Sequence, residues 1–260
     1  MSPMVHVTSN APTGTPNWLD LGIPDMARAK EFYGTVFGWE FQDYGPEAGH
    51  YHAVMLQGKP VAGMMKNPDD APSEYWWQTY FATEDCDGTV KRASDAGATV
   101  LMAPDDIMDQ GRMAVLSDPT GAQFGLWQGR AHVGSQIVNE PGSLVWSELV
   151  TADPGAAGDF YRAVFEYTLE DMPGGFDYTV FNRPDGRAIG GMLGRPDTAR
   201  PAWTVYFEVA DPDEAVRRAR DTGGTVVAEP EDSPYGRIAA VKDPFGAEFN
   251  VMRSAPPEGT

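Results

Sequence analysis

The sequence is poor in cysteine, in histidine and in positive charge. Its 260 residues include one Cys and four His, and 38 Asp and Glu outnumber 19 Lys and Arg, which gives a formal net charge of −19 at pH 7. A single cysteine excludes an internal disulfide and is typical of a reducing compartment. The shortage of Lys and Arg argues against binding to nucleic acid or to an anionic membrane surface, because both need a basic contact surface. The acidity is compatible with a cationic ligand.

Membrane-spanning and export segments are also missing from the sequence. No apolar run approaches the roughly 18 residues that a membrane helix needs. Residues 1–15 have neither the basic start nor the apolar stretch of a secretory signal. We therefore expect a cytoplasmic protein in which residues 1–15 form a flexible polar tail.

The chain contains an internal repeat, and each copy reads as a strand, a tight turn and a helix. Residues 18–39 (WLDLGIPDMARAKEFYGTVFGW) align without a gap with residues 146–167 (WSELVTADPGAAGDFYRAVFEY), and each aligned pair is 128 residues apart (146 − 18 = 128). A repeat of this length indicates two similar domains in one chain.

Two more segments repeat in the same order. Residues 77–100 align with 203–226 as a strand and a helix, and residues 111–127 align with 236–252 as a hairpin built on Asp-Pro-x-Gly. Each half therefore holds two strand–helix–hairpin units. We predict a tail at 1–15, a first domain at 16–128, a linker at 129–142, a second domain at 143–253 and a tail at 254–260.

Side-chain alternation divides the first strand of each half into two faces. Trp18 and Asp20 share one face, as do Trp146 and Glu148 in the copy, because strand side chains alternate with period two. The opposite face of the first strand should meet the apolar stripe of the following helix, and it carries Leu19, Leu21 and Ile23. The Trp and the carboxylate are thus left on the face that no helix covers.

The helix ends are also readable from the sequence. Asp25 and Asp153 stand at the N-cap positions of the two copies. Gly38 follows the first helix as a C-cap, whereas the copy has Glu166 at that place. We expect the helix of the second copy to stop differently.

These units resemble the glyoxalase/bleomycin-resistance/dioxygenase superfamily, also called vicinal oxygen chelate. The resemblance covers residues 16–253 and rests on helix stripes ending FYGTVFGW or FYRAVFEY and on hairpins built on DPTGA or DPFGA. It is strongest to two-domain actinobacterial members, often labelled glyoxalase-like or hydroxylase, some of which accompany antibiotic biosynthesis. It implies an α+β fold of tandem domains, in which four βαβββ modules form cup-shaped mixed sheets with the helices outside.

The metal enzymes of that superfamily carry His and Glu ligands on the concave faces of these cups. By the resemblance, the corresponding positions here are Trp18, Gln78, Gly125, Trp146, Thr204 and Asn250. None of these side chains is a competent ligand for Zn²⁺, Fe²⁺ or Mn²⁺. We therefore expect no metal cofactor. The only remaining candidate for a metal site is the pair His50 and His52, which lie on one strand face near the inner hairpin. Asp20 or Glu248 could supply a third ligand. Alternatively, His50 and His52 are two half-exposed strand histidines without a metal.

The concave faces combine aromatic and polar side chains, which is the composition of a small-molecule site. The residues predicted to bind a ligand are Trp18, Gln78, Tyr80, Gln123, Trp127, Trp146, Thr204, Tyr206, Glu208, Glu248 and Asn250. Alternatively, these aromatics fill the cups and pack the domain interface. Carboxylates beside indole favour a cationic group. The sequence therefore predicts a metal-independent protein that binds an aromatic or aminated natural product, in a sequestration or accessory role in antibiotic metabolism.

Two other functions remain open at this point. The protein is alternatively a cofactor-free or metal-dependent enzyme of the lyase, hydroxylase or oxygenase type, with Asp20 or Glu148 as general base and Tyr80 or Tyr206 stabilising an anion. A third possibility is a helper role in which the acidic exterior docks a partner enzyme. Two fused halves can complete the cups within one chain, so both a monomer and a homodimer are compatible with the sequence.

Overall fold

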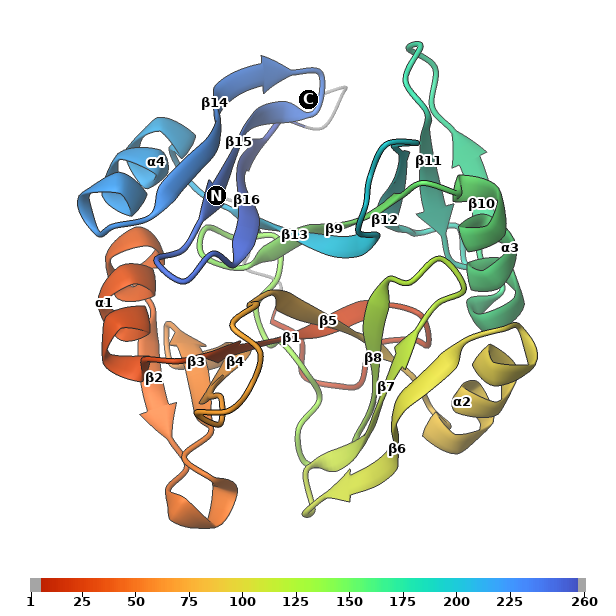
Figure 1. Cartoon of the computed structure of the whole chain (residues 1–260), viewed down its shortest axis with the longest axis horizontal. Helices are drawn as coiled ribbons and strands as arrows, with labels where there is room; N and C mark the ends of the chain where they lie inside the picture. Colours follow the sequence, from red (N-terminus) through yellow and green to blue (C-terminus); the bar gives the residue numbers. More distant parts are fainter. Residues whose placement is uncertain (1–5, 257–260) are drawn as a thin grey trace.

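The computed structural model describes residues 6–256, which form four α-helices and two eight-stranded sheets (Figure 1). The helices are α1 (Met26–Phe37), α2 (Cys86–Asp95), α3 (Pro154–Phe165) and α4 (Pro212–Asp221). None of them has the length and hydrophobicity that a membrane-spanning helix needs. The predicted α+β fold of four repeated modules is confirmed.

The first sheet has the strand order β2-β3-β4-β1-β5-β8-β7-β6. Its strands are β1 (Pro16–Ile23), β2 (Glu40–Asp43), β3 (His52–Leu56), β4 (Lys59–Lys66), β5 (Trp77–Ala82), β6 (Thr99–Ile107), β7 (Gly111–Ser117) and β8 (Gln123–Gly129). The sheet is mixed, because β1 pairs in parallel with β4 and antiparallel with β5, and β5 pairs in parallel with β8.

The second sheet repeats this order as β10-β11-β12-β9-β13-β16-β15-β14. Its strands are β9 (Leu144–Thr151), β10 (Thr168–Asp171), β11 (Tyr178–Asn182), β12 (Ala188–Gly194), β13 (Ala202–Glu208), β14 (Thr225–Ser233), β15 (Gly236–Lys242) and β16 (Glu248–Ser254). Residues 130–143 connect the two sheets. The segment that the sequence predicts as a linker therefore lies between them.

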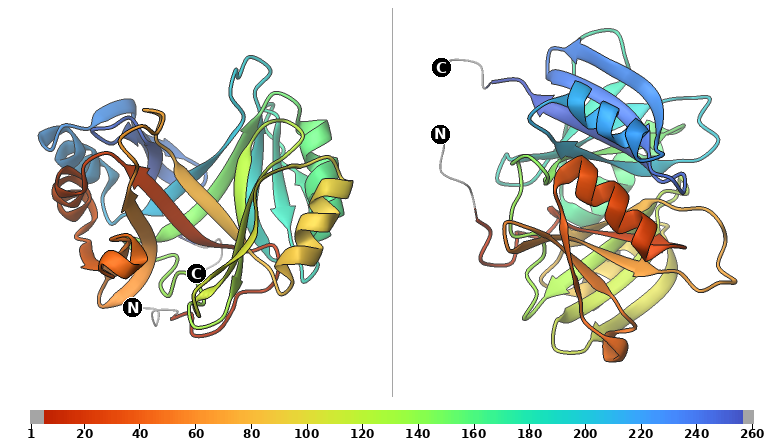
Figure 2. Two further views of the ribbon diagram at one scale, coloured as in Figure 1. Left: turned by 60° about the horizontal axis from the view of Figure 1, so that its bottom comes forward. Right: turned by 90° about the vertical axis from the view of Figure 1, so that its left-hand side faces the viewer.

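The two sheets lie back to back. Figure 1 shows their central strands, β1 and β5 against β9 and β13, with the arms of the two sheets bending apart. Helices α1 and α4 lie side by side between the arms at one side of the molecule, and α2 and α3 lie together at the other (Figures 1 and 2). Each sheet thus has a concave face that no helix covers, and the two cups open in opposite directions.

Each helix packs against both halves of the chain. The rings of Phe37 on α1 and Phe207 on β13 are 5.1 Å apart, and those of Phe81 on β5 and Phe165 on α3 are 5.4 Å apart. The buried core accordingly forms two clusters, each of which combines residues of the first and second sheets. Since burial of apolar area is the main stabilising contribution, neither half keeps its core without the other.

Two buried hydrogen bonds also join the halves. The Tyr161 hydroxyl on α3 donates to Oδ2 of Asp118 at 3.1 Å, and the Tyr33 hydroxyl on α1 donates to Oδ2 of Asp243 at 3.0 Å. Asp118 and Asp243 begin the two Asp-Pro-x-Gly turns, and their Oδ1 atoms accept hydrogen bonds from turn amides. Each carboxylate therefore fixes a turn in one half and a helix of the other.

The predicted division of β1 into two faces is confirmed. Leu19, Leu21 and Ile23 are fully buried in the cluster that contains α1. Trp18 and Asp20 lie on the other face, where the indole Nε1 donates to the carboxylate at 3.0 Å. The Trp and the carboxylate therefore belong to the concave face of the sheet.

Residues 6–15 of the segment predicted as a flexible tail make contacts with both halves of the chain. Residues 1–5 lie outside the described range, as do residues 257–260 of the predicted C-terminal tail. Within residues 6–15, the Gly14 amide donates to the Ala82 carbonyl at 2.9 Å, and the Tyr167 hydroxyl of the second half donates to the Gly14 carbonyl. This segment lies between the halves because its backbone groups have partners in both.

The expectation that α3, the helix of the second copy, ends differently from α1 is wrong. Glu166 adopts the left-handed conformation (φ 60°, ψ 29°), and Gly38 has nearly the same geometry (φ 73°, ψ 23°). In each case the cap amide donates to the carbonyl four residues earlier. A non-glycine residue costs roughly 1–2 kcal/mol in this conformation, so tertiary packing imposes it on Glu166.

We expect Glu166→Gly to stabilise the protein by about 1 kcal/mol, because glycine adopts the left-handed conformation without a Cβ clash. The side chain of Glu166 is exposed, so its loss removes no packing. Urea unfolding measures the change. Glu40→Gly, at an exposed strand position without a positive φ, is the control and should destabilise. If Glu166→Gly were less stable than the parent protein, the left-handed backbone of Glu166 would not be strained.

Candidate functional site

The concave face of the second sheet gathers one carboxyl group and three aromatic side chains. Trp146 and Glu148 alternate along β9 and pair with Tyr206 and Thr204 of β13. The Tyr206 hydroxyl donates to Oε1 of Glu148 at 3.1 Å. The Trp146 Nε1 donates to the hydroxyl of Tyr178, on β11, at 3.0 Å. The predicted Trp and carboxylate are thus brought together with two phenols.

The first sheet carries the same kinds of side chain with different hydrogen bonds. Oδ1 of Asp20 accepts from Trp18 Nε1 at 3.0 Å and from the Tyr51 hydroxyl at 2.5 Å. Tyr80, on β5, pairs with Trp18 on β1 and belongs to the same aromatic cluster. Gly63 makes room for Tyr51, because a Cβ there would lie 1.7 Å from the phenol oxygen.

Tyr51 and Tyr178 were not predicted as site residues. Each stands at the start of the first strand of an inner hairpin, and they are 127 residues apart (178 − 51 = 127). Aligning HYHAVM with DYTVFN would have identified the pair. Their contact with the carboxylates depends on the curvature of the sheets, which alternation along one strand does not report.

Burial sets the protonation of these groups. It raises the pKa of Asp20 and of Glu148, and hydrogen bonds from Tyr51 and Tyr206, respectively, oppose part of that increase. Burial, together with the nearby Glu148 carboxylate, also raises the pKa of Tyr206. The phenols therefore stay protonated and donate, while each carboxyl group exchanges its proton closer to neutral pH than an exposed acid does.

The two cups differ in how much aromatic surface they expose. Trp18, Tyr80 and Trp127 are only 4%, 5% and 6% exposed, whereas Trp146 and Tyr206, the counterparts of the first two, are partly exposed. The first cup is covered by His132 of the linker, whose ring lies 4.2 Å from that of Trp18. The second cup therefore offers more aromatic surface to a ligand.

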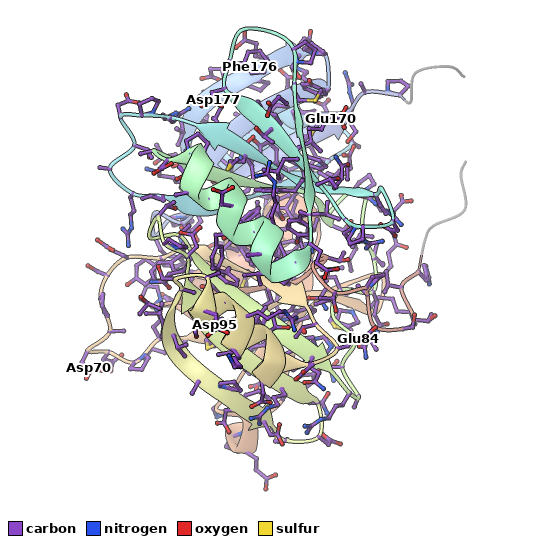
Figure 3. All side chains as sticks on the ribbon, turned by 90° about the vertical axis from the view of Figure 1, so that its right-hand side faces the viewer. Asp70, Glu84, Asp95, Glu170, Phe176 and Asp177 are labelled. Atoms are coloured by element: carbon purple, nitrogen blue, oxygen red, sulfur yellow. The ribbon has the colours of Figure 1, made fainter. Side chains whose placement is uncertain are left out.

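Exposed aromatic side chains also stand on the arms of the second cup. Phe176, between β10 and β11, is 54% exposed, and Figure 3 shows it at the tip of that arm. Tyr235, in the turn between β14 and β15 on the opposite arm, is 45% exposed. Both residues lie outside the set predicted from the sequence.

The remaining predicted residues differ in their places in the sheets, and Gln78 pairs with Asp20 across neighbouring strands. The Gln78 side chain donates to the Thr79 carbonyl at 3.2 Å, and the Glu208 carboxylate accepts from the Ser254 hydroxyl at 2.6 Å. Asn250 is buried and pairs with Tyr206. Gln123 and Glu248 are exposed at the first positions of β8 and β16, and Glu248 lies 3.5 Å from Lys242. No hydrogen bond joins Gln123 or Glu248 to either carboxyl group in the described part of the chain.

The residual His50/His52 site is not assembled. His50 lies in the turn before β3, with a φ of 56°, and only His52 is in the strand. His52 pairs with Met64, a core residue, so it faces the helix side of the sheet and not the cup that contains Asp20. Within residues 6–256, no three His, Cys, Asp or Glu side chains cluster in a way that would hold a metal ion. The donor set of the cups does not fit the metal that the resemblance implies.

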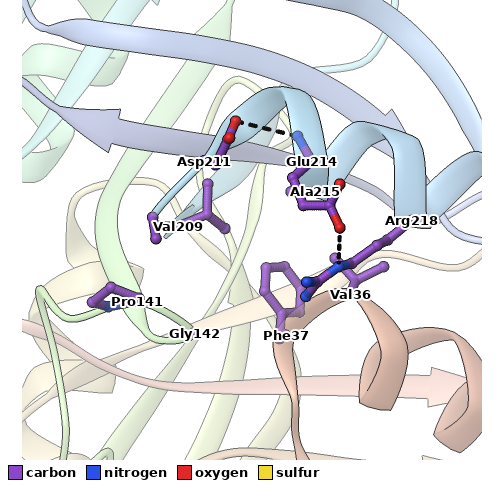
Figure 4. A pocket seen from close by; sticks show the side chains of 10 residues that line it. Val36, Phe37, Pro141, Gly142, Val209, Asp211, Glu214, Ala215 and Arg218 are labelled. Atoms are coloured by element: carbon purple, nitrogen blue, oxygen red, sulfur yellow. Dashed lines mark hydrogen bonds and ion pairs between the residues drawn. The ribbon is translucent and has the colours of Figure 1, made fainter.

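A cavity of about 290 Å³ lies away from both cups, between the end of α1 and the start of α4 (Figure 4). Phe37, Pro141 and Val209 contribute apolar surface, and Arg218 forms an ion pair with Glu214 at 2.8 Å. The one cation at this cavity is therefore already paired with a carboxylate, and Asp211 caps α4 through its Oδ1.

We expect Glu148→Gln to stabilise the protein at pH 7.5 by about 1 kcal/mol, the scale of one buried polar interaction. Folding raises the pKa of Glu148. The stability that Glu148 contributes is therefore fully present below its ordinary pKa of 4.5 and is lost as the pH rises through its pKa in the folded protein. Glutamine cannot ionise and still accepts from Tyr206. Urea unfolding between pH 4 and pH 8 should show an advantage that disappears at low pH; a constant difference would contradict the raised pKa.

Two family models and two named relatives match this chain over most of its length. Residues 15–126 match the family model described as Glyoxalase/Bleomycin resistance protein/Dioxygenase superfamily, and residues 145–252 match that of a Glyoxalase-like domain. CFP32 of Mycobacterium tuberculosis, named as a glyoxylase, is 41% identical over 251 residues, with 94% of this chain and 96% of that protein covered. The anthracycline biosynthesis protein DnrV of Streptomyces peucetius is 40% identical over 255 residues, with 92% and 93% covered.

Solved structures share the fold at lower identity. The 2,3-dioxygenase LapB from Pseudomonas sp. KL28 superimposes with a TM-score of 0.64 at 13% identity, over 96% of this chain and 97% of that one. At this identity the similarity concerns the fold alone. The identity to CFP32 and DnrV extends over nearly the whole chain. This chain therefore belongs to the glyoxalase/bleomycin resistance protein/dioxygenase superfamily.

Proposed function

We propose that the second cup binds a planar aromatic natural product that carries an amino group, without the help of a metal ion. The observation that carries this proposal is the group of Trp146, Tyr178 and Tyr206 around the Glu148 carboxyl. All three rings are partly exposed. Exposed aromatic faces favour a flat ring system, and a carboxylate beside indole favours a cation.

The name of one relative supports this class of ligand. DnrV, which is 40% identical, is named as an anthracycline biosynthesis protein. An anthracycline combines a planar aromatic ring system with an amino sugar, which are the two features that the aromatic rings and Glu148 would recognise. We propose that the rings of such a molecule lie against Trp146 and that its ammonium group pairs with Glu148.

Titration calorimetry with daunorubicin and with its aglycone, which lacks the amino sugar, tests this proposal. We expect one molecule bound per chain, with a Kd on the order of 1 μM, typical of a preformed aromatic pocket. The aglycone should bind about tenfold more weakly, because it lacks the charge that pairs with Glu148. EDTA should leave both titrations unchanged. Absence of heat with both compounds would contradict the ligand class, and loss of binding in EDTA would contradict metal independence.

A second candidate function is acid–base catalysis on a bound aromatic compound. It is favoured by the raised pKa of Glu148 and by the Tyr206 hydroxyl 3.1 Å from that carboxyl. Ionised Glu148 would accept a proton from an acidic C–H or phenol, and Tyr206 would donate a hydrogen bond to the resulting anion. Asp20 and Tyr80 offer the same chemistry in the more covered first cup.

Turnover assays separate the two candidates. An enzyme of this kind should convert its substrate in the presence of EDTA, and Glu148→Gln should lower kcat by about 100-fold or more, the usual contribution of a general base. Asp20→Asn is the matched control in the first cup. Tight binding without turnover would instead support sequestration or an accessory role.

A further inference from the structure

The first cup contains the same groups as the second, but a segment of the chain itself lies over them. We call residues 129–135 the plug. In it, the His132 carbonyl accepts from Trp127 Nε1 at 2.8 Å, and the His132 ring contacts Trp18 edge-on, with the ring centroids 4.2 Å apart and the planes at 84°. The centroid of Trp127 lies 5.4 Å from the same ring. His132 is thus the aromatic neighbour of both indoles.

One glycine and two backbone hydrogen bonds hold the plug in place. Gly134 has a φ of 100°, and a Cβ there would lie 2.5 Å from the carbonyl oxygen of Asn17, at the start of β1. The His132 amide donates to the Gln110 carbonyl at 3.1 Å, and the Ser135 amide donates to Asn17 at 2.7 Å. The main chain of the plug is therefore fixed at both ends without the imidazole.

The His132 ring has the character of a neutral planar ligand. Burial lowers its pKa to about 4, so the imidazole is uncharged at pH 7. It makes no side-chain hydrogen bond among the described residues, so ring contact is its main interaction. Trp146, the counterpart of Trp18, is partly exposed, and its Nε1 donates to the Tyr178 hydroxyl at 3.0 Å. The His132 ring therefore helps to bury the cluster of Trp18, Tyr80 and Trp127, against which Tyr51, Ile107 and Met113 also pack.

We infer that the first cup is a second binding site for small planar aromatic molecules, occupied by the His132 ring and opened when that ring is removed. Shortening His132 to alanine deletes the imidazole while leaving the backbone contacts of the plug intact. The space left behind is lined by Trp18 and Trp127, and an aromatic-lined cavity of this kind accepts a ring of matching size. This inference does not depend on what the second cup binds.

The test uses the full-length His132→Ala protein with imidazole and indole as probes. We expect its Tm to fall below that of the parent, and each probe at millimolar concentration to restore part of the loss, because a ligand that binds only the folded state stabilises it. The parent protein and His132→Phe, which keeps a ring at this position, should show at least tenfold weaker binding of both probes. Trp18→Phe combined with His132→Ala should weaken indole binding, whereas Trp146→Phe combined with His132→Ala should not.

A folded His132→Ala protein that responds to neither probe would overturn the inference. Equal responses of His132→Ala and His132→Phe would also overturn it, because the probes would then bind elsewhere. If His132→Ala is unfolded in buffer alone, the probes should restore its circular dichroism spectrum, and failure to do so would contradict the proposed site as well.

Discussion

Replacing Trp146 by alanine should weaken daunorubicin binding by about 30-fold or more, the effect of removing a central aromatic contact worth at least 2 kcal/mol. Trp146 is partly exposed on the concave face and is held by the hydroxyl of Tyr178 at 3.0 Å. Its indole is therefore both accessible to a ligand and fixed in orientation. The variant loses the broadest aromatic surface of the second cup.

Trp18→Ala is the matched control, because Trp18 occupies the same position in the first cup but is only 4% exposed beneath His132. It should change the Kd by less than about threefold, since rim or covered contacts contribute little. Circular dichroism must show that both variants are folded; Trp18→Phe keeps more of the packing if Trp18→Ala does not fold. Equal losses of affinity in the two variants would contradict a site in the second cup alone, and a larger loss in Trp18→Ala would place the ligand in the first cup.

Replacing Asp118 by alanine should destabilise the protein by about 3–5 kcal/mol, as expected when a buried carboxylate with several hydrogen bonds is removed. Oδ1 accepts from the amides of Thr120, Gly121 and Ala122 at 2.8, 3.0 and 3.0 Å. Oδ2 accepts from the Tyr161 hydroxyl of the second half at 3.1 Å. Alanine leaves the buried Ala122 amide and Tyr161 hydroxyl without this acceptor, and each unmet buried donor costs about 1–3 kcal/mol. The Gly121 amide still donates to the backbone carbonyl of residue 118.

Tyr161→Phe separates the two roles of Asp118. It removes the bond between the halves but keeps the turn, so it should cost only about 1–2 kcal/mol. Urea unfolding followed by fluorescence and by circular dichroism should show one transition in all three proteins, because the core clusters are shared between the sheets. A Tyr161→Phe loss as large as that of Asp118→Ala would mean that the turn contributes little. Separate transitions would contradict a shared core.

Local features of the structure follow directly from neighbouring residues. Asp25 and Asp153 cap their helices through amides three residues on, at 3.1 and 2.9 Å, as predicted. The Asp-Pro-x-Gly motifs form turns, and alternation places Leu19 under the helices. These predictions succeed because each depends on contacts within a few residues or on the period of a strand.

Predictions that depend on the path of the chain in space fail. His52 was expected beside His50 on a strand face near the inner hairpin, but β3 begins at His52, and that side chain faces the core. Glu166 was expected to end its helix differently, but packing holds it in the same left-handed conformation as Gly38. In both cases the local sequence allows more than one conformation, and distant contacts select one.

By itself, the sequence determined the duplicated α+β modules, the two faces of their first strands and the position of a Trp and a carboxylate on the concave face of each sheet. It did so because repeats, periodicity and turn chemistry are written in neighbouring residues. Only the tertiary structure decided that each helix packs against both halves, that Tyr51 and Tyr178 join the carboxylates, and that His132 covers the first cup. These contacts join residues far apart in the chain, and they exist only after the two sheets have curved and packed back to back.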